Sequence, residues 1–107
     1  VRVLSSNSGR IMYLSRAKVP HQYKEFIHSV SKHVSVISFE KKALVKYSYL
    51  KKSKYEKIED VELLRALEND MRVYTVKLEG DSFSIDVNDD YLKAQVTIKN
   101  DPIRKLY

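Results

Sequence analysis

The residues best suited to chemistry are lysines and tyrosines interspersed in the middle of the chain, between residues 41 and 57. Lysines at this density neutralise phosphate groups and displace condensed counterions, and exposed tyrosine rings can stack on nucleobases. Two arginines nearer the start of the chain add to this charge. The composition therefore predicts an anion-binding surface. Its candidate residues are Arg10, Arg16, Lys41, Lys42, Lys46, Tyr47, Tyr49, Lys51, Lys52 and Lys54.

The net charge of +6 is distributed unevenly along the 107 residues. Residues 1–57 hold 13 lysines and arginines and three acids, a balance of +10, whereas residues 58–107 hold 7 basic and 11 acidic residues, a balance of −4. Such asymmetry is typical of a surface that meets a polyanion or an acidic partner. We therefore predict a small basic protein that binds RNA or DNA, mainly through phosphate contacts and without strong sequence preference.

Two alternatives from other classes remain open at this point. The first is a protein–protein interaction module, such as a subunit, adaptor or inhibitor, whose basic half docks on an acidic partner surface or whose two halves pair in a homodimer. The second is a phosphoester enzyme that uses acidic turn residues with a metal ion. The acidic residues concerned are Asp81, Asp86, Asp89 and Asp90.

Motifs typical of enzymes, cofactor sites or metal sites are not recognisable in the sequence. His21, Glu25 and His28 have the spacing of one helix face, but that face lies opposite the apolar stripe, so a metal site is not favoured. The loop Ser5–Arg10 could cradle a phosphate but lacks the glycine and lysine spacing of a phosphate-binding loop. The sequence thus predicts no cofactor and leans against an enzyme.

A three-stranded antiparallel meander is predicted at Arg72–Lys99, because apolar residues occupy every second position in three successive segments. Turns are expected at Glu79–Ser82, where Gly80 accepts a positive φ, and at Asn88–Asp90. One face of such a meander is apolar and must be covered by other elements.

The remainder of the chain supplies candidate strands and two helices that would cover this face. Apolar residues at i, i+3, i+4 and i+7 predict a helix from Pro20 to His33, and a second helix follows Asp60, its expected N-cap. The expected strands are Val1–Leu4, Ile11–Ser15, Val34–Phe39 and Ala43–Leu50.

This order predicts a single α+β domain over residues 1–107. Two helices would pack on one face of a mainly antiparallel sheet, as a ferredoxin-like βαββαβ core with an appended C-terminal β-meander. The chain has no apolar run of the length that a membrane helix needs, and it has no cysteine. We expect a cytoplasmic protein without membrane contact. The scarcity of glutamine and cysteine gives the composition a mildly thermophilic character.

Overall fold

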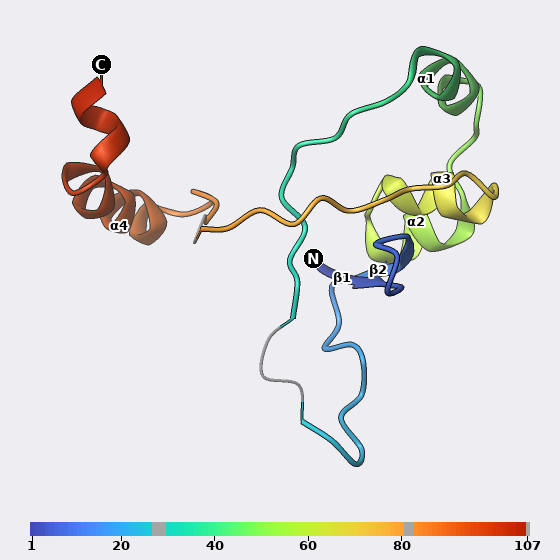
Figure 1. Ribbon diagram of the computed structural model, residues 1–107, viewed down its shortest axis with the longest axis horizontal. Helices are drawn as coiled ribbons and strands as arrows, with labels where there is room; N and C mark the ends of the chain where they lie inside the picture. The colour runs from blue at the N-terminus through green and yellow to red at the C-terminus, as the bar shows by residue number, and fades with distance from the viewer. Residues whose placement is uncertain (27–29, 81–82, 107) are drawn as a thin grey trace. The chain divides into compact units, whose positions relative to one another are not determined.

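The computed structural model describes residues 1–26, 30–80 and 83–106 (Figure 1). The chain divides into two compact units, unit 1 at Val1–Lys77 and unit 2 at Leu78–Tyr107. The predicted α+β class is confirmed, because the described residues form a two-stranded antiparallel sheet and four α-helices. The elements are β1 (Arg2–Ser5), β2 (Ile11–Ser15), α1 (Lys41–Ser48), α2 (Lys54–Glu59), α3 (Leu63–Glu68), α4 (Asn88–Lys99) and the 3-10 helix η1 (Pro102–Leu106).

Unit 1 is organised around the hairpin of β1 and β2, which confirms the two strands expected at the start of the chain. The strands pair antiparallel, with Val3 opposite Leu14. In the connecting loop, Gly9 has a φ of 80°, a conformation that a residue with a Cβ atom adopts only at a cost. Two isolated antiparallel bridges adjoin the hairpin: Lys32 pairs with Arg2 of β1, and Tyr74 pairs with Arg10, just before β2.

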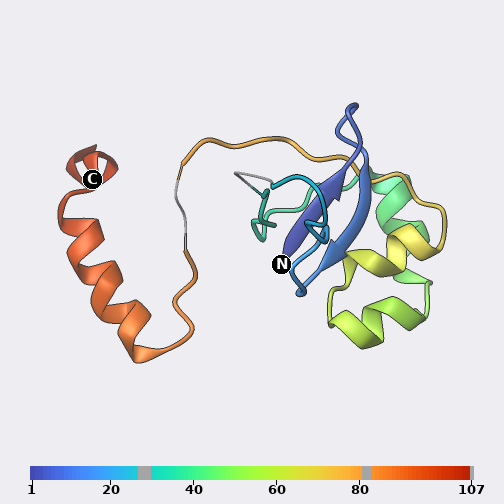
Figure 2. The same cartoon turned by 90° about the horizontal axis from the view of Figure 1, so that it is seen from below.

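The core of unit 1 lies between this hairpin and the polypeptide around α3, and Figure 2 shows the hairpin beside α2 and α3. Leu14 and Leu64 are its largest fully buried apolar side chains. Burial of such side chains from both elements removes apolar surface from water and fixes the helices against the strands. The buried core cluster consists of Val3, Ile11, Leu14, Val61, Leu63 and Leu64.

The strand predicted at Ala43–Leu50 is wrong, because α1 occupies these residues. Ala43, Tyr47 and Leu50 are the partly buried positions, and their spacing of four and three residues is that of one helix face. The same segment also shows apolar residues at every second position. A short apolar segment of this kind fits both the strand period of two residues and the helix period of 3.6 residues. The packing of Tyr47 favours the helix.

The meander predicted at Arg72–Lys99 is also wrong. Among the described residues of this range only Tyr74 makes a bridge, and its partner is Arg10, just before β2; the third predicted strand is the helix α4. The Asp90 carboxylate accepts hydrogen bonds from the backbone N–H groups of Asp86 and Val87, at 3.2 and 3.3 Å. These bonds satisfy donors at the start of the helix, and the acidic first turn also suits the helix dipole.

Three further expectations concern the segments between these elements. No described residue within Pro20–His33 is helical, and residues 27–29 of this predicted helix lie outside the described residues. Val34–Phe39 forms no strand. A helix does follow Asp60, but Asp60 is the C-cap of α2 with a φ of 51° rather than an N-cap.

The turns expected in the meander differ as well. Gly80 has the expected positive φ, at 125°, whereas residues 81–82 of the same predicted turn lie outside the described residues. Asn88–Asp90 is the first turn of α4 and not a hairpin turn. The ferredoxin-like core is not confirmed. Among helices of the described residues, none combines the length and apolar character needed to cross a bilayer.

Truncation of Leu14 tests this description of the core. Leu14→Ala should lower the free energy of unfolding by about 2–5 kcal/mol, because it removes buried methyl groups and leaves a cavity. Met12→Ala on the same strand is the control, since Met12 is 65% exposed and should change the stability by less than about 1 kcal/mol. Urea denaturation followed by circular dichroism measures both, and equal losses would contradict the assigned core.

Candidate functional site

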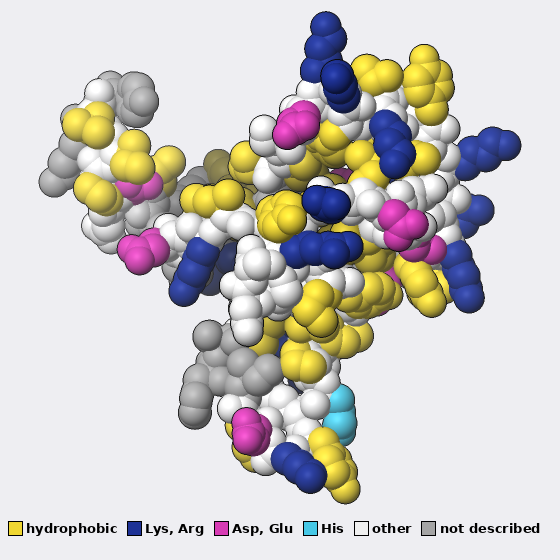
Figure 3. Space-filling view, turned by 45° about the vertical axis from the view of Figure 1, so that its right-hand side comes forward, with side chains coloured by type: hydrophobic (Ala, Val, Ile, Leu, Met, Phe, Trp, Pro, Cys, Tyr) yellow, Lys and Arg dark blue, Asp and Glu magenta, His cyan; other side chains and the backbone are white. Residues whose placement is uncertain are grey.

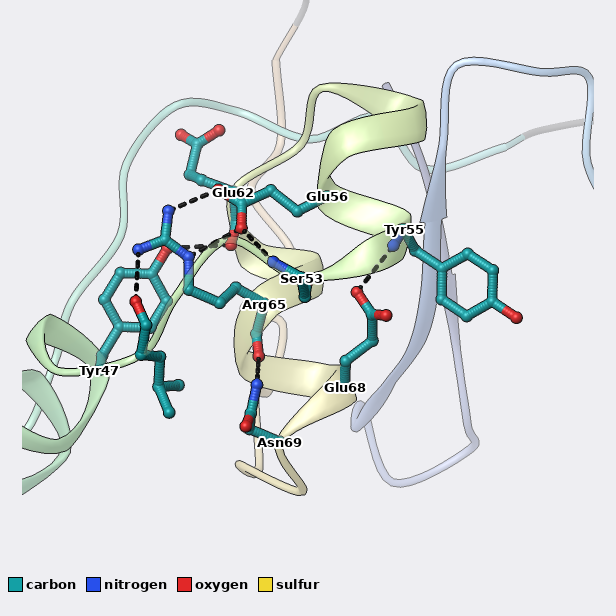
Figure 4. A network of polar contacts seen from close by, with 9 residues as sticks. Tyr47, Ser53, Tyr55, Glu56, Glu62, Arg65, Glu68 and Asn69 are labelled. Atoms are coloured by element: carbon teal, nitrogen blue, oxygen red, sulfur yellow. Dashed lines mark hydrogen bonds and ion pairs between the residues drawn. The ribbon is translucent and has the colours of Figure 1, made fainter.

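A buried ion pair between α2 and α3 is the centre of the polar network drawn in Figure 4. The Arg65 guanidinium donates through Nε to Glu56 Oε2 at 2.8 Å and through a terminal nitrogen to Glu56 Oε1 at 2.5 Å. Glu56 is only 5% exposed. This fork-to-fork geometry is the strongest form of a charged hydrogen bond. Hydrogen bonding from Arg65 lowers the pKa of Glu56 below its ordinary value, although burial opposes the shift.

The same arginine ties α1 and its following loop to α3. Its guanidinium lies 4.9 Å from the centre of the Tyr47 ring, and a terminal nitrogen donates to the Leu50 carbonyl at 3.4 Å. The Tyr47 hydroxyl donates to the Glu62 carbonyl at 2.9 Å. The Tyr47 ring packs on the Phe39 ring, with 5.4 Å between the ring centres. Burial raises the pKa of Tyr47. Tyr47 is therefore a packing residue.

Carboxylates also satisfy the first turn of α2. The Glu68 carboxylate accepts a hydrogen bond from the Tyr55 backbone N–H at 3.0 Å, and Glu56 accepts one from the Ser53 N–H at 3.1 Å. Both acceptors place negative charge where the helix dipole is positive. In α2 the charged Glu56 is therefore buried, whereas the apolar Ile58 is 68% exposed.

A second set of hydrogen bonds joins the end of β2 to the end of α2. The Glu59 carboxylate accepts from the Ser15 hydroxyl at 2.6 Å and from the Arg16 backbone N–H at 2.8 Å. In return, Arg16 donates through Nε to the Glu59 carbonyl at 2.7 Å and through a terminal nitrogen to the Asp60 carbonyl at 3.0 Å. The hydrogen bond from Ser15, followed by that from Arg16, lowers the pKa of Glu59.

Neither carboxylate is suited to take a proton from a substrate. A general base works best with a pKa near the working pH and with a free oxygen directed at the substrate. Glu56 and Glu59 instead have lowered pKa values, and both oxygens of each already accept hydrogen bonds. We interpret both groups as structural.

No group of three or more histidine or acidic side chains in the described ranges could hold a metal ion. The metal set weighed from the sequence includes His28, which lies outside the described residues. The expectation of no resident cofactor stays a prediction.

The structure separates the predicted anion-binding residues into two kinds. Arg16 and Tyr47 are engaged in the contacts above, whereas Tyr49 is 84% exposed. Lys42 and Lys46 lie four residues apart on α1 and therefore share one side of that helix. Basic side chains project at several separate points on the face drawn in Figure 3, with apolar side chains between them. The exposed lysines of the predicted set are Lys41, Lys42, Lys46, Lys51, Lys52 and Lys54, and Arg10 is exposed as well.

Glu56 and Arg65, the residues that organise unit 1, were missed by sequence reasoning. The spacing Ser53-x-x-Glu56 is the sequence signature of a helix start and could have located α2. The partner arginine has no comparable local signal, because it lies nine positions after Glu56 in the sequence.

Neutralising the buried acid tests the network. Glu56→Gln should lower the free energy of unfolding by roughly 3 kcal/mol, because it leaves the Arg65 charge half-buried without its partner. Glu62→Gln on the same connection is the matched control, since its side chain is exposed, and should cost less than about 1 kcal/mol. Urea denaturation of both variants measures the difference. A Glu56→Gln protein as stable as the control would show that the pair does not organise the unit.

The lowered pKa of Glu56 also predicts a pH dependence. Its contribution to stability is complete above the ordinary glutamate value of 4.5 and is lost as the pH falls through the lower folded-state pKa. The stability of the wild type should therefore fall steeply below about pH 4.5. Glu56→Gln should show a shallower fall. Parallel urea titrations between pH 7 and pH 3 measure this, and identical slopes would contradict it.

Comparison with known proteins places these elements in a family. A family model described as cytidylyltransferase matches residues 1–73. The 3-deoxy-manno-octulosonate cytidylyltransferases of Rickettsia prowazekii and Rickettsia akari are 37% identical to this chain over 94 residues, and that of Rickettsia rickettsii is 38% identical. Each alignment covers 88% of this chain, which spans 37% of the length of these relatives.

These similarities overturn the predicted function and its predicted partners. The family model and the relatives are named as cytidylyltransferases, which are enzymes, so a protein that binds RNA or DNA is the wrong conclusion, and so is a module that docks on an acidic protein. Clustered lysines indicate attraction to phosphate, but they do not distinguish a polynucleotide from a single nucleotide. The homodimer stays a prediction. By the extent of the family match and the identity to its relatives, this chain belongs to the cytidylyltransferase family.

Proposed function

We propose that this chain is part of an enzyme that transfers a cytidylyl group from CTP to a sugar acid of the 3-deoxy-manno-octulosonate type. The observation that carries the proposal is the 37–38% identity over 94 residues to relatives named for this transfer. In the reaction, a hydroxyl oxygen of the sugar acid attacks the α-phosphorus of CTP. The bond to the β-phosphate breaks, pyrophosphate leaves and the hydroxyl proton passes to solvent or a base.

Charge is the contribution that this chain would make to such a reaction. Both substrates are anions, and the balance of +10 in residues 1–57 favours their approach. We propose that the exposed lysines of α1 and of the following loop act in this way, through long-range attraction. Arg16 and Tyr47, by contrast, would act indirectly by holding β2 and α1 in place, since their polar groups are already bonded within unit 1.

A single domain, a cytoplasmic location, the ferredoxin-like arrangement of the core and the thermophilic composition stay predictions.

A chimera tests the proposed activity. This chain should replace its matched segment in the Rickettsia prowazekii relative, and pyrophosphate release should be measured with CTP and 3-deoxy-manno-octulosonate together. We expect one pyrophosphate per CTP consumed, and release should require the sugar acid.

The unmodified relative and reactions with ATP, GTP or UTP are the controls. Circular dichroism establishes that the chimera is folded. A folded chimera that releases no pyrophosphate, or releases it equally with every nucleotide, would overturn the proposal.

A further inference from the structure

A pocket of about 550 Å³ lies in unit 1, between the hairpin loop and the chain that leaves α3. Its volume is within the range of about 300–1,000 Å³ that is typical of sites for small molecules. Such sites combine an apolar wall with a few convergent polar groups. The pocket has both parts, and none of its lining residues takes part in the polar networks of α2 and α3.

The polar part of the pocket consists of Ser6, Ser8 and Arg10. The two serine hydroxyls are 2.9 Å apart, so one donates to the other and one hydroxyl hydrogen of the pair remains for a ligand. The Arg10 guanidinium makes no hydrogen bond or ion pair with a side chain or carbonyl in the described part of the chain. Its five N–H donors are therefore directed at solvent or at a ligand.

Backbone contacts hold this loop in one conformation. The Ser6 N–H donates to the Arg10 carbonyl at 2.8 Å, and the Gly9 N–H donates to the Ser6 carbonyl at 2.9 Å. Thr75 fastens the loop from outside, because both its N–H and its hydroxyl donate to the Gly9 carbonyl, at 2.8 and 3.0 Å. The backbone of the loop is thus fixed before a ligand arrives, which reduces the entropy cost of ordering it on binding.

The other wall of the pocket is apolar. It is formed by Ile11, Met12, Leu67 and Met71. Methionine side chains have three rotatable bonds and a polarisable sulfur, so they adapt to hydrocarbon chains of different shape. Met12 is 65% exposed in this structure and would lose water contact when such a chain is bound.

We propose that this pocket binds a small amphipathic anion, which is a carboxylate or phosphate monoester attached to a short hydrocarbon chain. Arg10 would pair with the anionic group through its planar fork, a serine hydroxyl would donate a further hydrogen bond, and the hydrocarbon would lie against Leu67 and Met71. This site is additional to cytidylyl transfer, and nothing in it depends on the proposed reaction.

Titration of the 15N-labelled 107-residue chain tests the proposal by NMR. Hexanoate and hexyl phosphate should each shift the backbone amide signals of residues 6–12 saturably. Hexanol, which lacks the charge, and acetate, which lacks the chain, should bind at least about tenfold more weakly. The stronger of the two anions identifies the preferred head group. Absence of saturable shifts with both anions, or equal binding of hexanol, would overturn the proposal.

Substitution of the arginine separates a built site from general charge attraction. Arg10→Met should weaken hexanoate and hexyl phosphate binding by about tenfold or more, because the charge is lost while a similar volume remains. Arg104→Met, which removes an exposed arginine of unit 2, is the matched control and should leave binding unchanged.

A second variant addresses the apolar wall. Met71→Glu should also weaken both anions at least about tenfold, since it replaces hydrocarbon contact on the apolar wall with a charged group and adds a negative charge to a pocket that binds anions. The amide spectrum of each variant reports whether the fold is kept. If Arg10→Met and Arg104→Met lower the affinity equally, or if neither lowers it, the pocket is not the binding site.

Discussion

The packing of unit 1 depends on the pairing of Glu56 with Arg65. This single arginine contacts the acid of α2, the ring of Tyr47 on α1 and the carbonyl of Leu50 in the loop between these helices. Three short helices, each too short to be stable alone, are thereby joined through one guanidinium group. Desolvating two charges is costly, and it is offset here because both oxygens of Glu56 and all three nitrogens of the Arg65 guanidinium make hydrogen bonds.

The parts of the fold that could be predicted are those with one dominant local signal. Ile11–Ser15 is a short segment that contains a β-branched residue and an aromatic residue, and a loop of serine and glycine precedes it. It forms β2 as expected. A helix after Asp60 was also predicted correctly, and Leu64, which the apolar spacing assigns to its inner face, is buried in α3. At Ala43–Leu50 and in α4, apolar residues fit both a period of two and a period of 3.6. The choice depends on the packing of Tyr47 in α1 and on the capping hydrogen bonds to Asp90 in α4, which the apolar pattern does not report.

The candidate site shows the same division between local and distant information. The number and the clustering of the lysines can be read directly from the sequence. The structural roles of Arg16 and Tyr47 are not visible, because the groups that bond them lie 15 to 44 residues away in the chain. Composition therefore predicted a surface that attracts anions, whereas the family to which the chain belongs came only from its similarity to named enzymes.

The number of residues between the partners of each contact also predicts the order in which unit 1 folds. Glu56 and Arg65 are nine residues apart, so their encounter closes a short loop at little entropic cost. Ser15 and Glu59 are 44 residues apart, and Thr75 and Gly9 are 66 apart. Because distant contacts form more slowly than near ones, the pair of helices α2 and α3 is the natural nucleus, and the hairpin loop would be fastened last.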